Sequence, residues 1–158
     1  RGRISEIAGA RSSGRTSILT ALLAAATAGE ETVALVDLRN SFDPVSAAAA
    51  GVDLEKLIWI RCSGNAEHAL RAADLLIQAG GFGVVAVDLA EAAARELNRI
   101  PSTAWFRFRR AVQDTPCILA VMSDQPLAKS CAAMVVKLPP RRAVFTGRAP
   151  FLLLRNAV

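Results

Sequence analysis

Short apolar runs alternate along the chain with longer segments in which apolar residues recur at helical spacing. The predicted strands span residues 4–8, 33–36, 57–60, 84–87, 118–122, 135–138 and 151–154. The predicted helices span residues 16–28, 45–50, 66–79, 90–97 and 102–112. Because apolar strands joined by helices form parallel sheets, this order predicts an α/β fold, a mostly parallel β-sheet with helices on both faces. A turn at Pro139 and Pro140 and a loop at Gly147 are expected between the last two strands.

A glycine-rich segment lies between the first predicted strand and the first predicted helix. Residues 9–17 read Gly-Ala-Arg-Ser-Ser-Gly-Arg-Thr-Ser, close to the phosphate-binding pattern G-x-x-x-x-G-K-[ST]. Arg15 stands where the pattern has lysine, so the charge is kept while a planar fork replaces a compact ammonium. The candidate phosphate-binding residues are Gly9, Ser12, Ser13, Gly14, Arg15, Thr16 and Ser17.

Further polar side chains stand at the ends of other predicted strands. Asp37 and Asp88 directly follow the strands of residues 33–36 and 84–87, and Ser123 and Asp124 follow the strand of residues 118–122. Parallel sheets bind their ligands at the carboxyl ends of the strands. We therefore expect these residues to lie at the same edge of the sheet as the glycine-rich loop.

The composition is typical of one globular domain. The chain has 158 residues, of which 53% are hydrophobic and 21% are charged, which excludes a disordered chain. Its 19 Lys and Arg against 14 Asp and Glu give a net charge of +5, which is compatible with an anionic partner. No apolar run reaches the roughly 20 residues that cross a bilayer, and no signal peptide is expected. We therefore expect no membrane partner.

The three cysteines, Cys62, Cys117 and Cys131, have no spacing typical of metal ligands. An odd count without a secretory leader indicates a reducing compartment and buried thiols. The sequence therefore predicts a cytoplasmic protein with no metal site.

Residues 2–17 resemble the opening of the RecA ATPase core, in which the step Ser12-Ser13-Gly14 is typical. The resemblance covers most of residues 2–124 and continues through residues 35–37, 42–45, 51–57, 67–70, 73–74 and 84–88. It implies a RecA-like fold, with residues 1–158 as a single core domain that lacks the family's N-terminal oligomerisation helix and C-terminal domain. It also implies that Asp43 and Asp88 belong to a nucleotide site, with Asp88 on magnesium. The alternative is that Asp88 caps the segment that follows it.

Departures from this family bear on activity. Arg15 replaces the lysine that contacts the β- and γ-phosphates, Arg39 replaces the catalytic glutamate, and Ser46 replaces the tyrosine that stacks on adenine. A cation cannot act as the base that orients the attacking water. The resemblance thus implies a pseudo-ATPase with no catalytic residue, no required cofactor and at most weak binding of ATP and magnesium. Arg39 is expected either to be solvated or to fill the phosphate pocket with its own charge.

Basic residues gather in the second half of the chain, where no acidic residue follows Asp124. Residues 105–110 mix aromatic residues with arginines and predict a helix with a buried aromatic face and a basic outer face. The alternative is a nucleic-acid surface. The family's second DNA-contacting loop is reduced to residues 123–130, so DNA binding is expected to be weak. The candidate partner or DNA surface comprises Arg107, Arg109, Arg110, Arg141, Arg142 and Arg148, unless these residues form only a solubilising edge.

Three functions are consistent with these observations. The first is a catalytically degenerate RecA-like protein, similar to the ImuA/SulA-like branch, acting by contact in DNA repair, the SOS response and translesion synthesis. The resemblance then implies RecA and a Y-family polymerase subunit as partners. The second is a weak or switch-like DNA-dependent ATPase of the recombinase type, against which Arg39 and Ser46 argue. The third is a SulA-type cell-division inhibitor, against which the retained glycine loop argues mildly.

Overall fold

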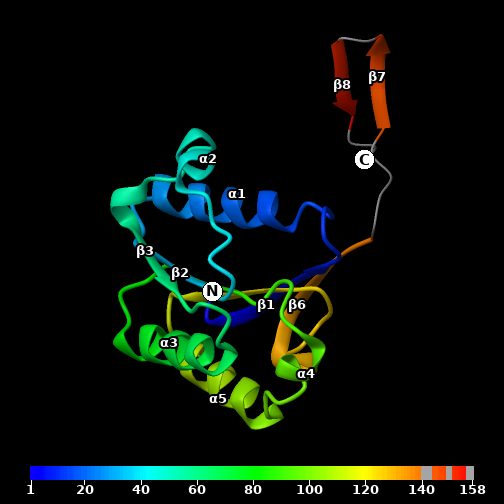
Figure 1. Ribbon diagram of the computed structural model, residues 1–158. Coiled ribbons are helices and arrows are strands. Elements are labelled where there is room, and N and C mark those ends of the chain that lie inside the picture. The colour runs from blue at the N-terminus through cyan, green and yellow to red at the C-terminus, as the bar shows by residue number, and fades with distance from the viewer. Residues whose placement is uncertain (140–143, 149–150, 156–158) are drawn as a thin grey trace.

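The chain is built around a six-stranded sheet in which every strand pair is parallel (Figure 1). The computed structural model describes residues 1–139, 144–148 and 151–155, with side chains described for residues 1–139. The strands of this sheet are β1 (Arg3–Gly9), β2 (Val33–Asp37), β3 (Leu57–Arg61), β4 (Val84–Asp88), β5 (Ile118–Ser123) and β6 (Ala132–Leu138). A separate antiparallel pair is formed by β7 (Val144–Arg148) and β8 (Phe151–Arg155).

The strand order is β3-β2-β4-β5-β1-β6. The first crossover, from β1 to β2, therefore passes over β4 and β5, and this places the carboxyl ends of four strands next to one another. In register, Asp37 lies opposite Asp88 across β2 and β4, and Ala8 lies opposite Ser123 across β1 and β5. The expected gathering of loops at one edge of the sheet is confirmed.

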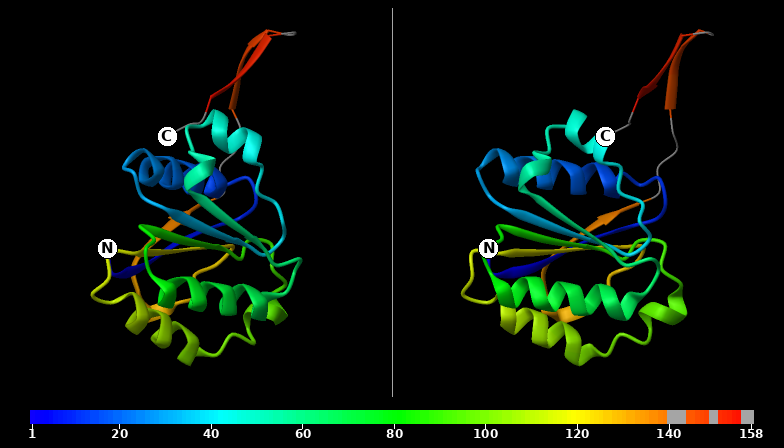
Figure 2. Two further views of the ribbon diagram at one scale, coloured as in Figure 1. Left: turned by 90° about the vertical axis from the view of Figure 1, so that its left-hand side faces the viewer. Right: turned by 60° about the vertical axis from the view of Figure 1, so that its left-hand side comes forward.

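Helices cover both faces of the sheet, as Figure 2 shows in two further views. On one face lie α1 (Arg15–Ala28) and α2 (Pro44–Ala49). On the other lie α3 (Ala66–Ala79), α4 (Ala94–Leu97) and α5 (Ser102–Val112). Short 3₁₀ turns, η1 (Leu54–Lys56) and η2 (Lys129–Cys131), precede β3 and β6. The predicted α/β architecture is therefore correct.

Each face has its own apolar cluster. Leu19 and Leu23 of α1 pack with Leu35 of β2 on one side. Trp105 and Phe108 of α5 pack with strand and α3 residues on the other. Val-rich strands with both faces covered are almost fully buried, which explains why β2 and β4 read as continuous apolar runs.

Capping and helix-ending residues near the helix termini explain the helix ends that the sequence predicts well. The side chain of Asn65 accepts a hydrogen bond from the His68 amide at 3.0 Å and so caps α3 at its start. Gly80, with a φ of 70°, follows its end. Pro101 precedes α5, whose buried face includes Trp105 and Phe108. The predicted buried aromatic face of this helix is confirmed.

Two local predictions are wrong. Residues 90–93 are not helical, because Glu91 takes a left-handed φ of 60° and the Ala90 amide binds back to Asp88. Gly147 is not in a loop but in β7, opposite Leu152. Residues 151–154 form a strand as predicted, but this strand pairs with β7 and not with the six-stranded sheet. The apolar strand β8 pairs with Val144–Arg148, and this pairing makes a strand of a segment whose own sequence did not predict one.

The three cysteines are free and buried, so the thiol part of that prediction is confirmed. Burial raises the pKa of the Cys117 thiol, which keeps it protonated and unreactive. Among the described residues, no helix has the length and apolar character needed to cross a membrane.

Candidate functional site

The glycine-rich loop makes a tight connection from β1 to α1. A Cβ atom on Gly9 would lie 2.5 Å from Ser13 Oγ and 2.9 Å from the Leu138 carbonyl oxygen, so only glycine fits. Gly14, at the other end, has a φ of 92° in the left-handed region. Between them the Ser13 amide donates to the Ala10 carbonyl at 3.1 Å. Gly9 is therefore explained by the close approach of neighbouring atoms, and Gly14 by its left-handed backbone conformation.

The amino end of α1 is open to solvent. Gly14 precedes the helix and supplies no side-chain cap, and Thr16 and Ser17 in the first turn are exposed. A Cβ atom on Gly14 would meet no atom within 4 Å. Uncapped N–H groups at the positive end of a helix dipole form an anion-binding arrangement. The backbone of this loop therefore has the geometry of a phosphate cradle.

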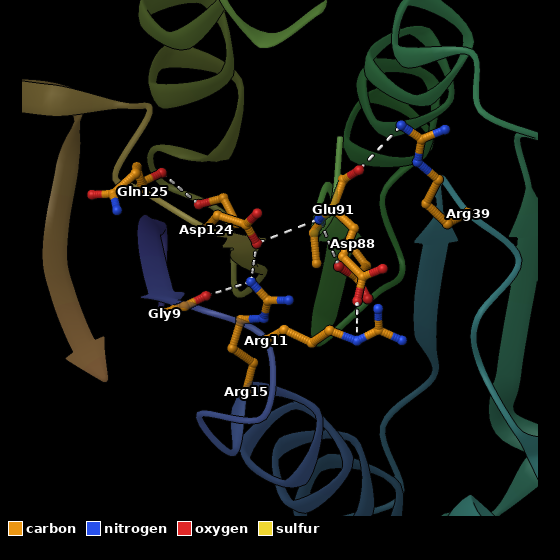
Figure 3. A network of polar contacts seen from close by, with 10 residues as sticks. Gly9, Arg11, Arg15, Arg39, Asp88, Glu91, Asp124 and Gln125 are labelled. Carbon is orange, nitrogen blue, oxygen red and sulfur yellow. Dashed lines mark hydrogen bonds and ion pairs between the residues drawn. The ribbon is translucent and has the colours of Figure 1, made fainter. Parts of the chain in front are cut away.

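The cation of the loop is already engaged within the chain. Arg15 is buried, and its Nη1 donates to the Gly9 carbonyl and to the Asp124 carboxylate (Figure 3). Its side chain is 8% exposed, and that of Asp124 is 44% exposed. The ion pair joins the loop after β1 to the residue after β5, so the guanidinium lies between two strand ends.

Asp124 also receives a longer contact from the loop that follows β4. The Glu91 amide donates to Asp124 Oδ1 at 3.4 Å. The Glu91 carboxylate in turn lies 3.6 Å from Arg11 Nε in an exposed ion pair, which contributes little on its own. These contacts link the loops after β1, β4 and β5 into one polar network (Figure 3).

Arg39 points away from the phosphate loop. Its Nη2 donates to the Glu91 carbonyl at 3.1 Å and to Glu96 Oε2 at 3.3 Å. Glu96 also accepts from the Ala93 amide at 3.1 Å and so fixes the start of α4. Arg39 therefore does not fill the phosphate pocket. It is an exposed surface residue, as the other expectation stated, and its guanidinium is paired with Glu96.

Asp37 is a structural residue. Its buried carboxylate accepts hydrogen bonds from the Arg39 amide at 3.2 Å, the Phe42 amide at 2.9 Å and Trp59 Nε1 at 3.2 Å. These bonds hold the loop that follows β2 against β3.

Asp43 caps α2. Its carboxylate accepts from the Val45 amide at 3.1 Å and from Ser46 Oγ, and the Ser46 bond lowers the pKa of Asp43. Asp43 and Ser46 line a cleft of about 450 Å³ together with Thr16 and Ser17 of α1. The structure thus brings Asp43 beside Thr16 and Ser17 at the exposed start of α1.

Asp88 ends β4 and accepts a hydrogen bond from the Ala90 amide at 2.9 Å. It therefore caps the following segment, which was one of its two predicted roles. Burial is the main cause of its raised pKa, Asp37 adds to the shift, and the Arg15 charge opposes it. A partly buried carboxylate close to another carboxylate is unfavourable for stability, and such groups cluster at functional sites.

The N-terminal part of the chain is similar to known proteins. Residues 1–98 match the RecA N-terminal domain. The chain belongs to that family. It is 40% identical over 88 residues to Protein RecA of Deinococcus radiodurans, covering 56% of this chain and 24% of the relative. It is also 40% identical over 88 residues to Protein RecA of Fusobacterium nucleatum, covering 56% and 23%. The chain thus spans about a quarter of the length of these curated relatives.

The basic helix α5 of this RecA-family chain lies on the face opposite α1 (Figure 1). Arg107 Nε forms an ion pair with Asp74 Oδ1 at 3.3 Å, and its guanidinium lies 5.8 Å from the Phe108 ring centre. Arg109 and Arg110 are exposed and form no ion pair with a carboxylate among residues 1–139. The predicted basic outer face is present, although one of its three charges is paired.

The remaining candidates of that surface follow α5 in the sequence. Arg141 and Arg142 fall outside the described residues, and Arg148 lies in β7. Among the described residues, the predicted surface is represented by Arg107, Arg109 and Arg110 on α5 and by Arg148 in β7.

Sequence reasoning on the RecA-like site missed the partners of its two arginines. Asp124 was expected at the correct edge of the sheet, but not as the partner of Arg15, which lies 109 positions away. Glu91 and Glu96 were not singled out. The available signal was a carboxylate directly after the strand next to β1, since strand ends of a parallel sheet converge.

We expect Asp88→Asn to stabilise the RecA-like core by roughly 1 kcal/mol at neutral pH, a size common for single substitutions. The amide still accepts the Ala90 bond but carries no charge to bury. Because the folded-state pKa of Asp88 is raised above its ordinary value of 3.8, burial of the ionised group opposes folding above that raised pKa. The gain should shrink as pH falls through the raised pKa towards 3.8. Urea unfolding of both proteins at several pH values measures this, and a gain that does not vary with pH would contradict it.

Proposed function

We propose that this chain is a catalytically degenerate RecA-type protein that acts in DNA repair by contact and not by ATP hydrolysis. The observation that carries the proposal is the state of Arg15. The cation of the phosphate loop is buried in an ion pair with Asp124 of the same chain. A phosphate group would have to displace that carboxylate to reach the guanidinium.

The residues around the loop fit a phosphate better than they fit ATP turnover. The left-handed Gly14 and the open first turn of α1 suit an anion. ATP hydrolysis also needs a group that orients water, and Arg39 at that position is a cation paired with Glu96. Magnesium, if it binds with a nucleotide, would use Asp88 and Thr16. We therefore propose weak nucleotide binding without a required cofactor.

The proposed role is that of an accessory protein similar to the ImuA/SulA-like branch. In that role the chain would contact RecA and a Y-family polymerase subunit during the SOS response and translesion synthesis. Membership of the RecA family supports the link to DNA repair. The internal pairing of Arg15 and of Arg39 supports the accessory role over the motor role.

The outer face of α5 is the proposed contact surface. It presents Arg109 and Arg110 together with Phe106, whose side chain is 54% exposed. This helix packs on the sheet face opposite α1, so a partner can bind there without meeting the phosphate loop. Intrinsic binding of single-stranded DNA at this surface is proposed to be weak and dominated by phosphate contacts.

Charge reversal tests this surface. We expect Arg109→Glu with Arg110→Glu to abolish retention on single-stranded DNA at low salt, or co-purification of RecA, because each substitution replaces an attractive charge by a repulsive one. Arg141→Glu with Arg142→Glu forms a second variant for the basic residues outside the described part. Retention and co-purification are measured on the full chain over a salt series.

The matched control is Arg61→Glu with Arg71→Glu, which makes the same change of charge in a cleft beside the edge strand β3. Two outcomes would contradict the proposed contact surface. One is that DNA retention and RecA co-purification survive charge reversal on α5 and at Arg141 and Arg142. The other is that the control variant weakens them equally.

A further inference from the structure

The contact between Arg15 and Asp124 has the form of an autoinhibitory contact. The guanidinium is nearly enclosed, whereas the carboxylate is about half exposed. Asp124 therefore reaches inward from the surface to a cation that the loop holds in place through the Gly9 carbonyl. An exposed partner on a buried charge can be exchanged for another anion without unfolding the core.

We propose that Asp124 is an internal competitor for phosphate groups at the loop of residues 9–16. Its carboxylate takes the place on Arg15 that a phosphoryl oxygen of a diphosphate would take. This inference rests on the proposed reading of the loop as a weak phosphate site. It attributes the weak phosphate binding to the Asp124 side chain of the same protein.

The charges around Arg15 explain why the competition favours Asp124. Asp88 lies at the end of the neighbouring strand, and Glu91 contacts Asp124 through its amide. Arg11 is the other cation of the loop, and it is paired with Glu91. A diphosphate must therefore enter a site whose positive charges are already balanced by carboxylates.

Displacement of Asp124 would change a defined part of the surface. The Glu91 amide would lose its acceptor, and the turn in which Ser123 Oγ donates to the Gln125 carbonyl at 2.8 Å would be released from the loop. The change would stop at residue 127. Buried Glu6 holds the Leu127 and Ala128 amides at 2.7 and 2.9 Å through Oε1 and is not part of the exchange.

The test is calorimetry with inorganic pyrophosphate on the full chain. We expect Asp124→Asn to bind pyrophosphate roughly tenfold to a hundredfold more tightly than the unchanged protein, the range expected for a hydrogen bond to a charged group. Asp114→Asn is the matched control, because it removes the same charge from the loop between α5 and β5, at the amino end of the strands. Its affinity should stay within about twofold of the unchanged protein, since a distant exposed charge is largely screened.

A further arm tests Arg15 directly. Arg15→Ala in the Asp124→Asn background should lose the gained affinity. Asp124→Asn affinity within twofold of the unchanged protein, or a gain that persists without Arg15, would overturn the proposal. Failure of the proposed function would be seen separately, as ATP turnover by the unchanged protein.

Hydrogen exchange on the unchanged protein keeps the test independent of the variants. Saturating pyrophosphate should slow exchange in residues 10–17 and speed it at Glu91 and in residues 123–126, while residues 127 and 128 stay unchanged. Slower or unchanged exchange in residues 123–126 would show that Asp124 is not displaced and would overturn the proposal.

Discussion

ATP hydrolysis by this chain is expected to stay at background, even with magnesium and single-stranded DNA present. Arg39 stands where the RecA resemblance places the catalytic glutamate, and loss of a catalytic base typically lowers the rate by about 10²–10⁴-fold. Under the proposed competition, the pairing of Arg15 with Asp124 would lower access to the phosphate site further. A steady-state assay of phosphate release, with RecA as the positive control, measures this.

A double variant that restores the residues implied by the RecA resemblance at positions 15 and 39 provides the comparison for that assay. Arg39→Glu with Arg15→Lys is not expected to recover turnover, because Ser46, which the resemblance places at the adenine-stacking position, hydrogen-bonds Asp43 in the cap of α2. Robust turnover of the unchanged chain, stimulated by DNA, would contradict the non-enzymatic function.

The second large effect is expected for Asp37→Ala. This substitution leaves the Arg39 and Phe42 amides and Trp59 Nε1 without their buried acceptor. Because a hydrogen bond to a charged group contributes roughly 1.5–3 kcal/mol and these three donors are only partly buried, the free energy of unfolding should fall by about 3 kcal/mol. Chemical denaturation followed by tryptophan fluorescence measures the loss.

Trp59→Phe separates one of these bonds from the rest. It removes the indole donor but keeps an aromatic ring near Phe42, whose ring centre lies 5.4 Å from that of Trp59. We expect a loss of about 1 kcal/mol, close to the net value of one hydrogen bond. A loss for Asp37→Ala no greater than that for Trp59→Phe would show that the carboxylate does not organise this loop.

The fold could be predicted where the determinants are local. The apolar runs of β2 and β4 and the cap residue Asn65 of α3 lie within the segments that they define. The prediction failed at residues 90–93, where alanine content favours a helix but Asp88 and the left-handed Glu91 hold a turn. Helix propensity is a weak prior that such tertiary contacts override.

The same distinction between local and distant determinants applies to the candidate site. The loop of residues 9–16 could be read from its glycines, since their spacing is a local requirement. The partners of Arg15 and Arg39 could not, because Asp124 and Glu96 are brought to them only by the order of strands in the sheet. For Arg39 the sequence did not reveal the carboxylate with which its charge is paired.

The position of β1 has a consequence for the synthesis of the chain. Its only neighbours in the six-stranded sheet are β5 and β6, which begin at Ile118 and Ala132. While residues 1–98 emerge from the ribosome, β2, β3 and β4 can pair, but β1 has no strand to join. The phosphate loop attached to β1 is therefore among the last parts to be fixed. A release of the chain before β5 would leave the family-matching segment with its first strand, and its glycine loop, exposed to chaperones and proteases.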